Sequence, residues 1–135
     1  MVLLDTVNGW EQGFVSCSLT IRPGIPFFES GKGVPSYVGL EYMAQCCGAY
    51  AGLEGLAAGQ PVKLGFLLGT RNFHAIPDYF APGELLTVTG REVMRQDVMG
   101  VFDCRIACGN NEVASAQLNL YRPENAAELL RQPQG

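Results

Sequence analysis

Positive charge is scarce in this sequence. The 135 residues include nine lysines and arginines against thirteen aspartates and glutamates, and the net charge is −4. The nine cations are scattered, whereas binding to nucleic-acid phosphates needs clustered Lys and Arg, so the sequence argues against a nucleic-acid partner. Charged residues of both signs make up only 16% of the chain. This is little for a monomer's surface, so we expect an extensive subunit interface and at least a dimer.

Long apolar segments are also missing. Each apolar stretch is interrupted by Gly or a charge well short of the ~20 residues that a membrane-spanning helix needs. The start, Met-Val-Leu-Leu-Asp, lacks the positive region and long apolar core of a signal peptide. Because a strand-like stretch begins at residue 2, we expect the chain start to be cropped or unusually short. These features favour a cytoplasmic protein without a membrane span.

The five cysteines show no disulfide framework, and their odd number favours free thiols in a reducing cytoplasm. Cys104 and Cys108 are four residues apart in a probable strand, which places them on one face. The pattern provides no second ligand pair and no nearby His, so we interpret these cysteines as small buried apolar residues rather than metal ligands. We expect neither a metal nor another cofactor.

The order of hydrophobic patterns predicts an α+β fold. Alternation and turn residues indicate a hairpin of strands at 2–7 and 14–21 around a turn flanked by Gly9 and Gly13. A Gly- and Pro-rich loop follows, and then a helix from about Pro35 to about Leu53, with Pro35 as its first residue. Further strands are predicted at 64–72, 85–91, 100–107 and 112–121. We expect one domain over residues 1–123 and a polar C-terminal tail over 124–135.

The predicted helix is apolar on nearly every side, which is typical of a helix buried on several faces. Glu41 is the only charge between Pro35 and Glu54. An isolated carboxylate is expensive to bury, so we expect it to have a partner or a raised pKa. One long helix followed by antiparallel strand patterns indicates a helix wrapped by a curved antiparallel sheet.

The order of several short motifs resembles bacterial 3-hydroxyacyl-acyl-carrier-protein dehydratases. In those enzymes a Phe-rich loop and a Pro lead into a buried helix that carries Glu-x-x-Ala-Gln. The matching residues here are Pro26-Phe27-Phe28, Pro35 and Glu41-Tyr42-Met43-Ala44-Gln45, followed by Asn72-Phe73-His74 and Pro82-Gly83-Glu84. The stretches 65–71 and 114–123 are similar, more narrowly, to the dehydratase-like subunit of aryl polyene pigment clusters.

This resemblance implies a hotdog fold, a homodimer or heterodimer with its sheets joined edge to edge, and active sites at the subunit interface. It also implies an acyl chain beside the central helix, and elimination of water from a 3-hydroxyacyl thioester of acyl carrier protein or coenzyme A. Elimination needs a base for the α-proton, an acid for the departing hydroxyl and donors for the thioester oxygen, which a helix N-terminus supplies.

The resemblance places Glu41 at the acidic helix position, and Gln45, one turn later, would orient that carboxylate or a water, or tie the helix to a neighbouring strand. Phe28, Ser36, Tyr37, Val38 and His74 are the expected substrate-binding residues. The loop His of the resembled enzymes has no counterpart in residues 27–35, and Pro35-Ser36 replaces the usual Pro-Gly. A dyad of Glu41 with a relocated base at His74, the single histidine, is an alternative.

Three hypotheses remain open at the level of sequence. The first is a dehydratase-like subunit, inactive or weakly active alone, whose Glu41 completes the site of a His-bearing hotdog partner. The second is a hotdog thioesterase with Glu41 as base or nucleophile. The third is a non-catalytic subunit that binds acyl thioesters.

Overall fold

The computed structural model describes residues 2–57, 66–96 and 99–121. The expected polar tail at 124–135 and the first residues of the strand predicted at 64–72 lie outside these ranges. Ten elements follow one another in the order β1 (Thr6–Glu11), β2 (Phe14–Thr20), β3 (Val34–Pro35), the 3₁₀ turn η1 (Ser36–Val38), α1 (Gly39–Ala57), β4 (Phe66–Ala75), β5 (Tyr79–Phe80), β6 (Leu85–Gln96), β7 (Met99–Cys108) and β8 (Asn111–Tyr121).

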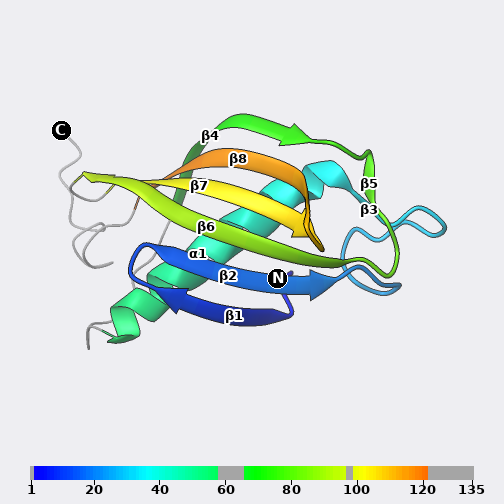
Figure 1. The fold of residues 1–135 in the computed structure, drawn as a ribbon, viewed down its shortest axis with the longest axis horizontal. Coiled ribbons are helices and arrows are strands. Elements are labelled where there is room, and N and C mark those ends of the chain that lie inside the picture. The colour runs from blue at the N-terminus through cyan, green and yellow to red at the C-terminus, as the bar shows by residue number, and fades with distance from the viewer. Residues whose placement is uncertain (1, 58–65, 97–98, 122–135) are drawn as a thin grey trace, which may run out of the picture.

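Six of the strands form one curved antiparallel sheet in the order β1-β2-β6-β7-β8-β4, and β3 pairs with β5 in a two-stranded ribbon. Helix α1 lies across one face of the large sheet, behind it in Figure 1. In most of β6, β7 and β8, buried residues alternate with half-buried or exposed ones, as expected of strands with one covered face. This arrangement confirms the predicted α+β class, with one long helix against an antiparallel sheet.

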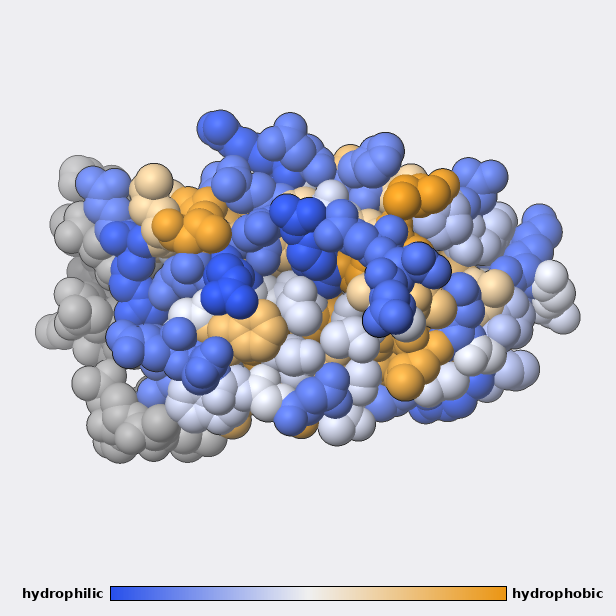
Figure 2. Space-filling model, viewed as in Figure 1, coloured by the Kyte–Doolittle hydropathy of each residue, from blue (hydrophilic) through white to orange (hydrophobic). Residues whose placement is uncertain are grey.

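The core lies between α1 and the inner face of the sheet. Alternate residues of each strand point toward the helix and are almost fully buried, among them Val15 and Leu19 of β2, Leu86 and Val88 of β6, Phe102 and Ile106 of β7, and Leu118 of β8. The outer face of the sheet, seen in Figure 2, carries mostly hydrophilic side chains with scattered apolar ones. One face packed and one face solvated is the usual state of an antiparallel sheet.

The first hairpin is displaced from its prediction. The first strand spans 6–11 instead of 2–7, and the turn is confined to Gln12 and Gly13. Gly9 lies inside the strand, at a bulge between Val7 and Gly9 where the register shifts. The bulge adds one residue, so Val7 and Trp10 both lie on the inner face, opposite the buried Cys17 and Val15.

The helix also begins later than predicted. Pro35 pairs with Tyr79 as the last residue of β3, and α1 starts only at Gly39, after η1. A Cβ atom at Gly39 would lie 3.1 Å from Ile106 Cδ1 and 3.2 Å from Phe80 Cζ. The absent side chain therefore lets the helix start approach the sheet closely.

The sheet covers α1 on one face only, so the expectation of a helix enclosed on several sides is not met by the single chain. The covered face is fully buried and consists of Tyr42, Met43, Cys46, Cys47 and Tyr50. Glu41 and Gly48 lie on the opposite side and are exposed. The sequence pattern did not predict the exposed face, because small residues such as Gly48 occur on buried and on exposed helix faces alike.

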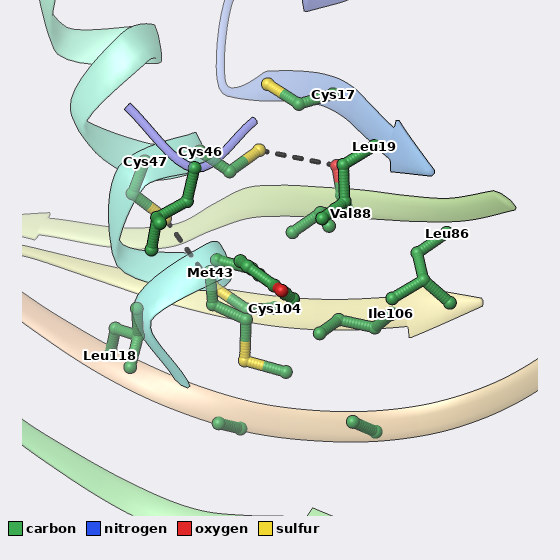
Figure 3. Packing of buried hydrophobic residues seen from close by; sticks show 14 of the residues in the cluster. Cys17, Leu19, Met43, Cys46, Cys47, Leu86, Val88, Cys104, Ile106 and Leu118 are labelled. Carbon is green, nitrogen blue, oxygen red and sulfur yellow. Dashed lines mark hydrogen bonds between the residues drawn. The ribbon is translucent and has the colours of Figure 1, made fainter. Parts of the chain in front are cut away.

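Four buried cysteines meet in the middle of the core (Figure 3). Cys46 donates to the backbone oxygen of Val88 at 3.3 Å, and the sulfurs of Cys47 and Cys104 lie 3.5 Å apart. A Cβ atom at Gly90 would lie 3.0 Å from Cys47 Sγ, so this glycine makes room for the thiol. The neighbouring thiol of Cys104 and burial raise the pKa of Cys47 well above its usual value. These cysteines act as small apolar core residues.

Candidate active site on the open face of the central helix

Glu41 stands on the side of α1 that faces away from the sheet. Positions 41 and 48 are seven residues apart, nearly two full turns, so Glu41 and Gly48 lie on the same line along the helix. Tyr37, four residues before Glu41, is 68% exposed at this end of the molecule. The Glu41 side chain is exposed and makes no hydrogen bond or ion pair with any residue that the structure describes. The single chain thus presents a carboxylate that nothing in its own described part neutralises.

Gln45 lies one turn after Glu41 but serves a different contact. Its Oε1 atom accepts a hydrogen bond from the backbone N–H of Leu3 at 2.8 Å. This bond holds the segment before β1 against the helix. In the described part of the chain Gln45 does not bond to Glu41, so the structure shows it tying the helix to the N-terminal segment.

Four of the expected substrate-binding residues lie in the loop and at the helix start. Phe28 is half-buried and packs against the core, and Val38 is buried beneath the helix start. Ser36 is half-buried, and its backbone N–H donates to the oxygen of Asp78 at 2.9 Å. Tyr37 points outward. The Ser36 amide is therefore engaged in the contact between the helix start and the segment before β5.

The loop at 27–35 is held in a compact shape by its own backbone. Glu29 and Gly33 bond to each other through both N–H groups, at 2.7 and 3.0 Å, and the Lys32 N–H donates to Glu29 O at 3.0 Å. The Tyr79 hydroxyl donates to Glu29 Oε1 at 3.0 Å, and Lys32 Nζ lies 5.7 Å from the centre of the Tyr79 ring. Sequence reasoning missed this cluster, because nothing links residues 29 and 79 in the pattern.

His74 lies on the other side of the sheet from Glu41. It is exposed on β4 and pairs with Ser115 of β8. Directly paired residues point to the same face, and the neighbours Ala114 and Ala116 are buried on the inner face. His74 is therefore on the outer face, with the sheet between it and the helix. The structure does not bring His74 together with Glu41.

A second feature missed from the sequence is the hydroxyl of Tyr42, the residue after Glu41. The side chain is 1% exposed, and its oxygen is buried without a hydrogen-bond partner among the described residues. Burial, together with the nearby Asp5 carboxylate, raises the pKa of Tyr42 to about 12. Arg22 in turn lowers the pKa of Asp5 through a side-chain hydrogen bond. The helix thus carries a protonated phenol beneath its open face.

Metal ligands do not gather in the described part of the chain: no group of three or more His, Cys, Asp or Glu residues there could hold an ion. Cys104 is buried in the core, and Cys108 is half-buried and donates to Glu84 at 3.4 Å. Among the described residues, no helix has both the length and the apolar character needed to span a membrane.

Comparison with known proteins places this fold and site in context. The family model of the ApeP-like dehydratases, described as ApeP dehydratase, matches residues 1–131. A chain of the dehydratase heterocomplex ApeI:P from Xenorhabdus doucetiae is 27% identical, with a TM-score of 0.87 over 99% of this chain and 90% of that one. No curated protein matches the sequence.

More distant structures share the fold alone. The E. coli PaaI protein from the phenylacetic acid degradation operon is 14% identical, with a TM-score of 0.68 over 87% of this chain and 78% of that one. The smu.793 protein of Streptococcus mutans, solved with acetyl CoA, is 18% identical, with a TM-score of 0.63 over 87% of each chain. Together with the heterocomplex these neighbours confirm the hotdog fold, and the match over residues 1–131 shows that the chain belongs to the ApeP-like dehydratase family.

Proposed function

We propose that this chain is the carboxylate-bearing half of a 3-hydroxyacyl-thioester dehydratase site that a His-bearing hotdog partner completes. The observation that carries the proposal is the separation of Glu41 from any histidine of its own chain. Glu41 is exposed on the open face of α1, and the single histidine, His74, lies across the sheet from it. The family and the similarity to a chain of a dehydratase heterocomplex support the reaction class and the need for a second subunit.

The chemistry divides between the two subunits. Glu41 would protonate the departing hydroxyl, while the partner's histidine would accept the α-proton of the thioester. The helix start at Tyr37 and Val38 would receive the thioester oxygen, because a helix N-terminus favours developing negative charge, whereas the Ser36 N–H already donates to Asp78. Docking of the partner over the open face would remove Glu41 from water.

The substrate would be the thioester of an acyl carrier protein or of coenzyme A. The half-buried Phe28 would offer apolar surface for the acyl part, while Val38 lies buried in the core beneath the helix start. The partner would join an edge of the sheet, since β1 and β4 are the outermost strands of the described sheet. Sedimentation that shows only monomers at micromolar concentration, alone and with the partner, would contradict this assembly.

The test is an assay of the purified chain alone, the partner alone and the mixture, with a 3-hydroxyacyl thioester and detection of the 2-enoyl product. We expect weak or no turnover by the chain alone, because loss of the base removes about 10²–10⁴-fold of rate. Turnover should appear in the mixture and fall with Glu41→Gln. Robust dehydration by the chain alone, abolished by His74→Ala, would refute the shared site.

The same assay separates the other hypotheses. Release of free thiol without dehydration would indicate a thioesterase, and thioester binding without either reaction in the mixture would indicate a non-catalytic subunit. The PaaI and smu.793 structures resemble this chain at the level of the fold alone and do not favour hydrolysis.

A further inference from the structure

We infer that Gln45 is a positioning residue that acts through the N-terminal strap, residues 2–5. It holds the strap along the helix turn that carries Glu41, where Val2 offers an apolar surface to the acyl chain of the substrate. The inference rests on the proposed function, because it assigns a further contact beside the same carboxylate. It starts from the 2.8 Å hydrogen bond that the Leu3 N–H donates to Gln45 Oε1.

The strap follows the turn of α1 that begins at Glu41. Leu3 meets this turn at Gln45, which lies on the same side of the helix as Glu41. Asp5 meets it at Tyr42: burial, and then the nearby Asp5 carboxylate, raise the pKa of the Tyr42 hydroxyl. Contacts at both ends of this turn therefore align the strap with the part of the helix that carries the carboxylate.

The two ends of the strap are held by different parts of the fold. Asp5 is anchored at the end of β2, since its carboxylate accepts the Thr20 N–H and an Arg22 N–H, each at 2.9 Å. At Leu3 the backbone bonds to the helix through Gln45. Loss of the Gln45 oxygen would therefore leave the strap attached at Asp5 and loosen its first residues from the helix.

The strap brings an apolar side chain to a helix face that has few of its own. Leu3 is buried in the core, whereas Val2 is 84% exposed. The peptide N–H that bonds to Gln45 joins Val2 to Leu3, so Val2 lies next to Gln45. Beyond Glu41 on the same line of the helix, the exposed Gly48 has no side chain. Val2 is therefore the apolar side chain that the strap adds beside this line.

The order of the reacting groups places the acyl chain against this surface. In the proposed site the thioester oxygen lies at the helix start, and the hydroxyl on the third carbon lies at Glu41. The carbons beyond it continue past Glu41 along the helix, in the direction of Gln45 and Gly48. A long acyl chain therefore reaches Val2, whereas a butyryl group ends beside Glu41. Gln45 and Val2 thus favour long, apolar acyl groups.

The experiment measures the binding of decanoyl and butyryl coenzyme A to the purified complex with the His-bearing partner, by calorimetry. Gln45→Leu removes the acceptor of the Leu3 N–H at similar size, and Val2→Ser removes the apolar side chain from an exposed position. Each should weaken decanoyl binding by about tenfold and leave butyryl binding unchanged. With the corresponding 3-hydroxyacyl substrates, the KM of the decanoyl form should rise while kcat stays constant.

Two controls separate the strap from a general loss of structure. Gln45→Glu keeps an oxygen for the Leu3 N–H, so the decanoyl affinity should be retained. Val93 is 53% exposed on β6, close to Arg95, which bonds to Glu54 near the other end of α1. Val93→Ser should therefore change neither affinity.

The outcomes distinguish this inference from the proposed function. A fall in kcat for both chain lengths with Gln45→Leu, as for Glu41→Gln, would mean that Gln45 acts on Glu41 directly and would overturn the inference. Equal weakening of both thioesters, or unchanged decanoyl binding with Val2→Ser, would overturn it as well while leaving the shared site intact. The expected binding changes without any turnover by the complex would refute the proposed reaction and leave the role of the strap standing. No decanoyl binding by the wild-type complex would refute both.

Discussion

Two tyrosines on α1 have buried rings but differ in the hydrogen bonding of their hydroxyls, which allows a matched test. Tyr42 has a buried hydroxyl without a partner among the described residues. The Tyr50 hydroxyl accepts the Gly13 N–H at 2.8 Å and donates to Glu54 Oε2 at 3.0 Å. Both rings are fully buried, so Tyr→Phe keeps the packing and removes one oxygen. The same substitution should therefore change stability in opposite directions.

The magnitudes follow from the hydrogen bonds. A buried hydroxyl without a partner costs about 1–3 kcal/mol, so Tyr42→Phe should raise the free energy of unfolding by that amount. Tyr50→Phe leaves the half-buried Gly13 amide and the Glu54 carboxylate without these hydrogen bonds and should lower it by about 0.5–1.5 kcal/mol. For a domain of this size, 1 kcal/mol corresponds to roughly 4 °C in Tm. Urea and thermal unfolding followed by circular dichroism would measure both.

Alkaline pH gives the same prediction a second readout. The pKa of Tyr42 is raised to about 12 in the folded protein from an ordinary value of 10.0. Because Tyr42 ionises at lower pH in the unfolded chain than in the folded protein, it does not alter the pH dependence of stability below pH 10. The free energy of unfolding then falls as pH rises from 10 through 12, in total by about 3 kcal/mol. Tyr42→Phe should unfold later than the wild type as pH increases over this window. Destabilisation by Tyr42→Phe, of the size seen for Tyr50→Phe, would refute the reasoning, because it would mean that the hydroxyl is bonded in the folded protein.

Three further predictions concern the core, the loop and the N-terminal segment. A thiol reagent such as Ellman's should modify the half-buried Cys108 in the native protein and the other four cysteines only after unfolding; early reaction of Cys47 would contradict the closed core. Gly31 and Gly33 both have positive φ, but only at Gly33 would a Cβ atom overlap backbone, at the carbonyl of Phe80. Gly31→Ala should therefore lower the free energy of unfolding by about 1–2 kcal/mol and Gly33→Ala by more. Equal losses in urea titrations would count against this. Arg22 lowers the pKa of Asp5, so the Asp5 carboxylate stabilises the fold above its ordinary pKa and loses this effect as pH falls. Asp5→Asn should therefore lower the free energy of unfolding at pH 7 and make it fall less steeply toward pH 3. An unchanged dependence of stability on acid pH would argue against the ion pair.

The sequence predicted the architecture where the side-chain alternation was regular. The strands β6, β7 and β8 were placed to within a few residues, except for the C-terminal end of β6. The helix start was misplaced because Pro35 is equally compatible with a first helical residue and with the end of a short strand. The ribbon of β3 and β5 was missed, since two-residue strands 45 positions apart leave no periodic signal.

The candidate site was predictable only in part. Glu41 was identified because the resemblance places an acid at this position and because it is the only charge between Pro35 and Glu54. Its exposure depends on which face the sheet covers, and composition does not report that. The contact of Gln45 with Leu3 and that of Glu29 with Tyr79 join residues 42 and 50 positions apart. Such contacts arise from tertiary packing, and a single sequence carries no sign of them.

The bulge in β1 makes the length of the first hairpin matter more than its composition. Trp10 reaches the ring of Tyr50, 6.4 Å away between centroids, only because one extra residue lies between Val7 and Gly9. Removing that residue would move Val7 to the outer face or turn Trp10 away from Tyr50, since alternation along a strand has a period of two. Point substitutions at the exposed Asn8 should therefore be tolerated, whereas a deletion of one residue there would remove the Trp10–Tyr50 ring contact or turn Val7 away from Cys17. Related chains that keep the contact between Trp10 and Tyr50 should therefore differ in the residue types of β1 but keep its length.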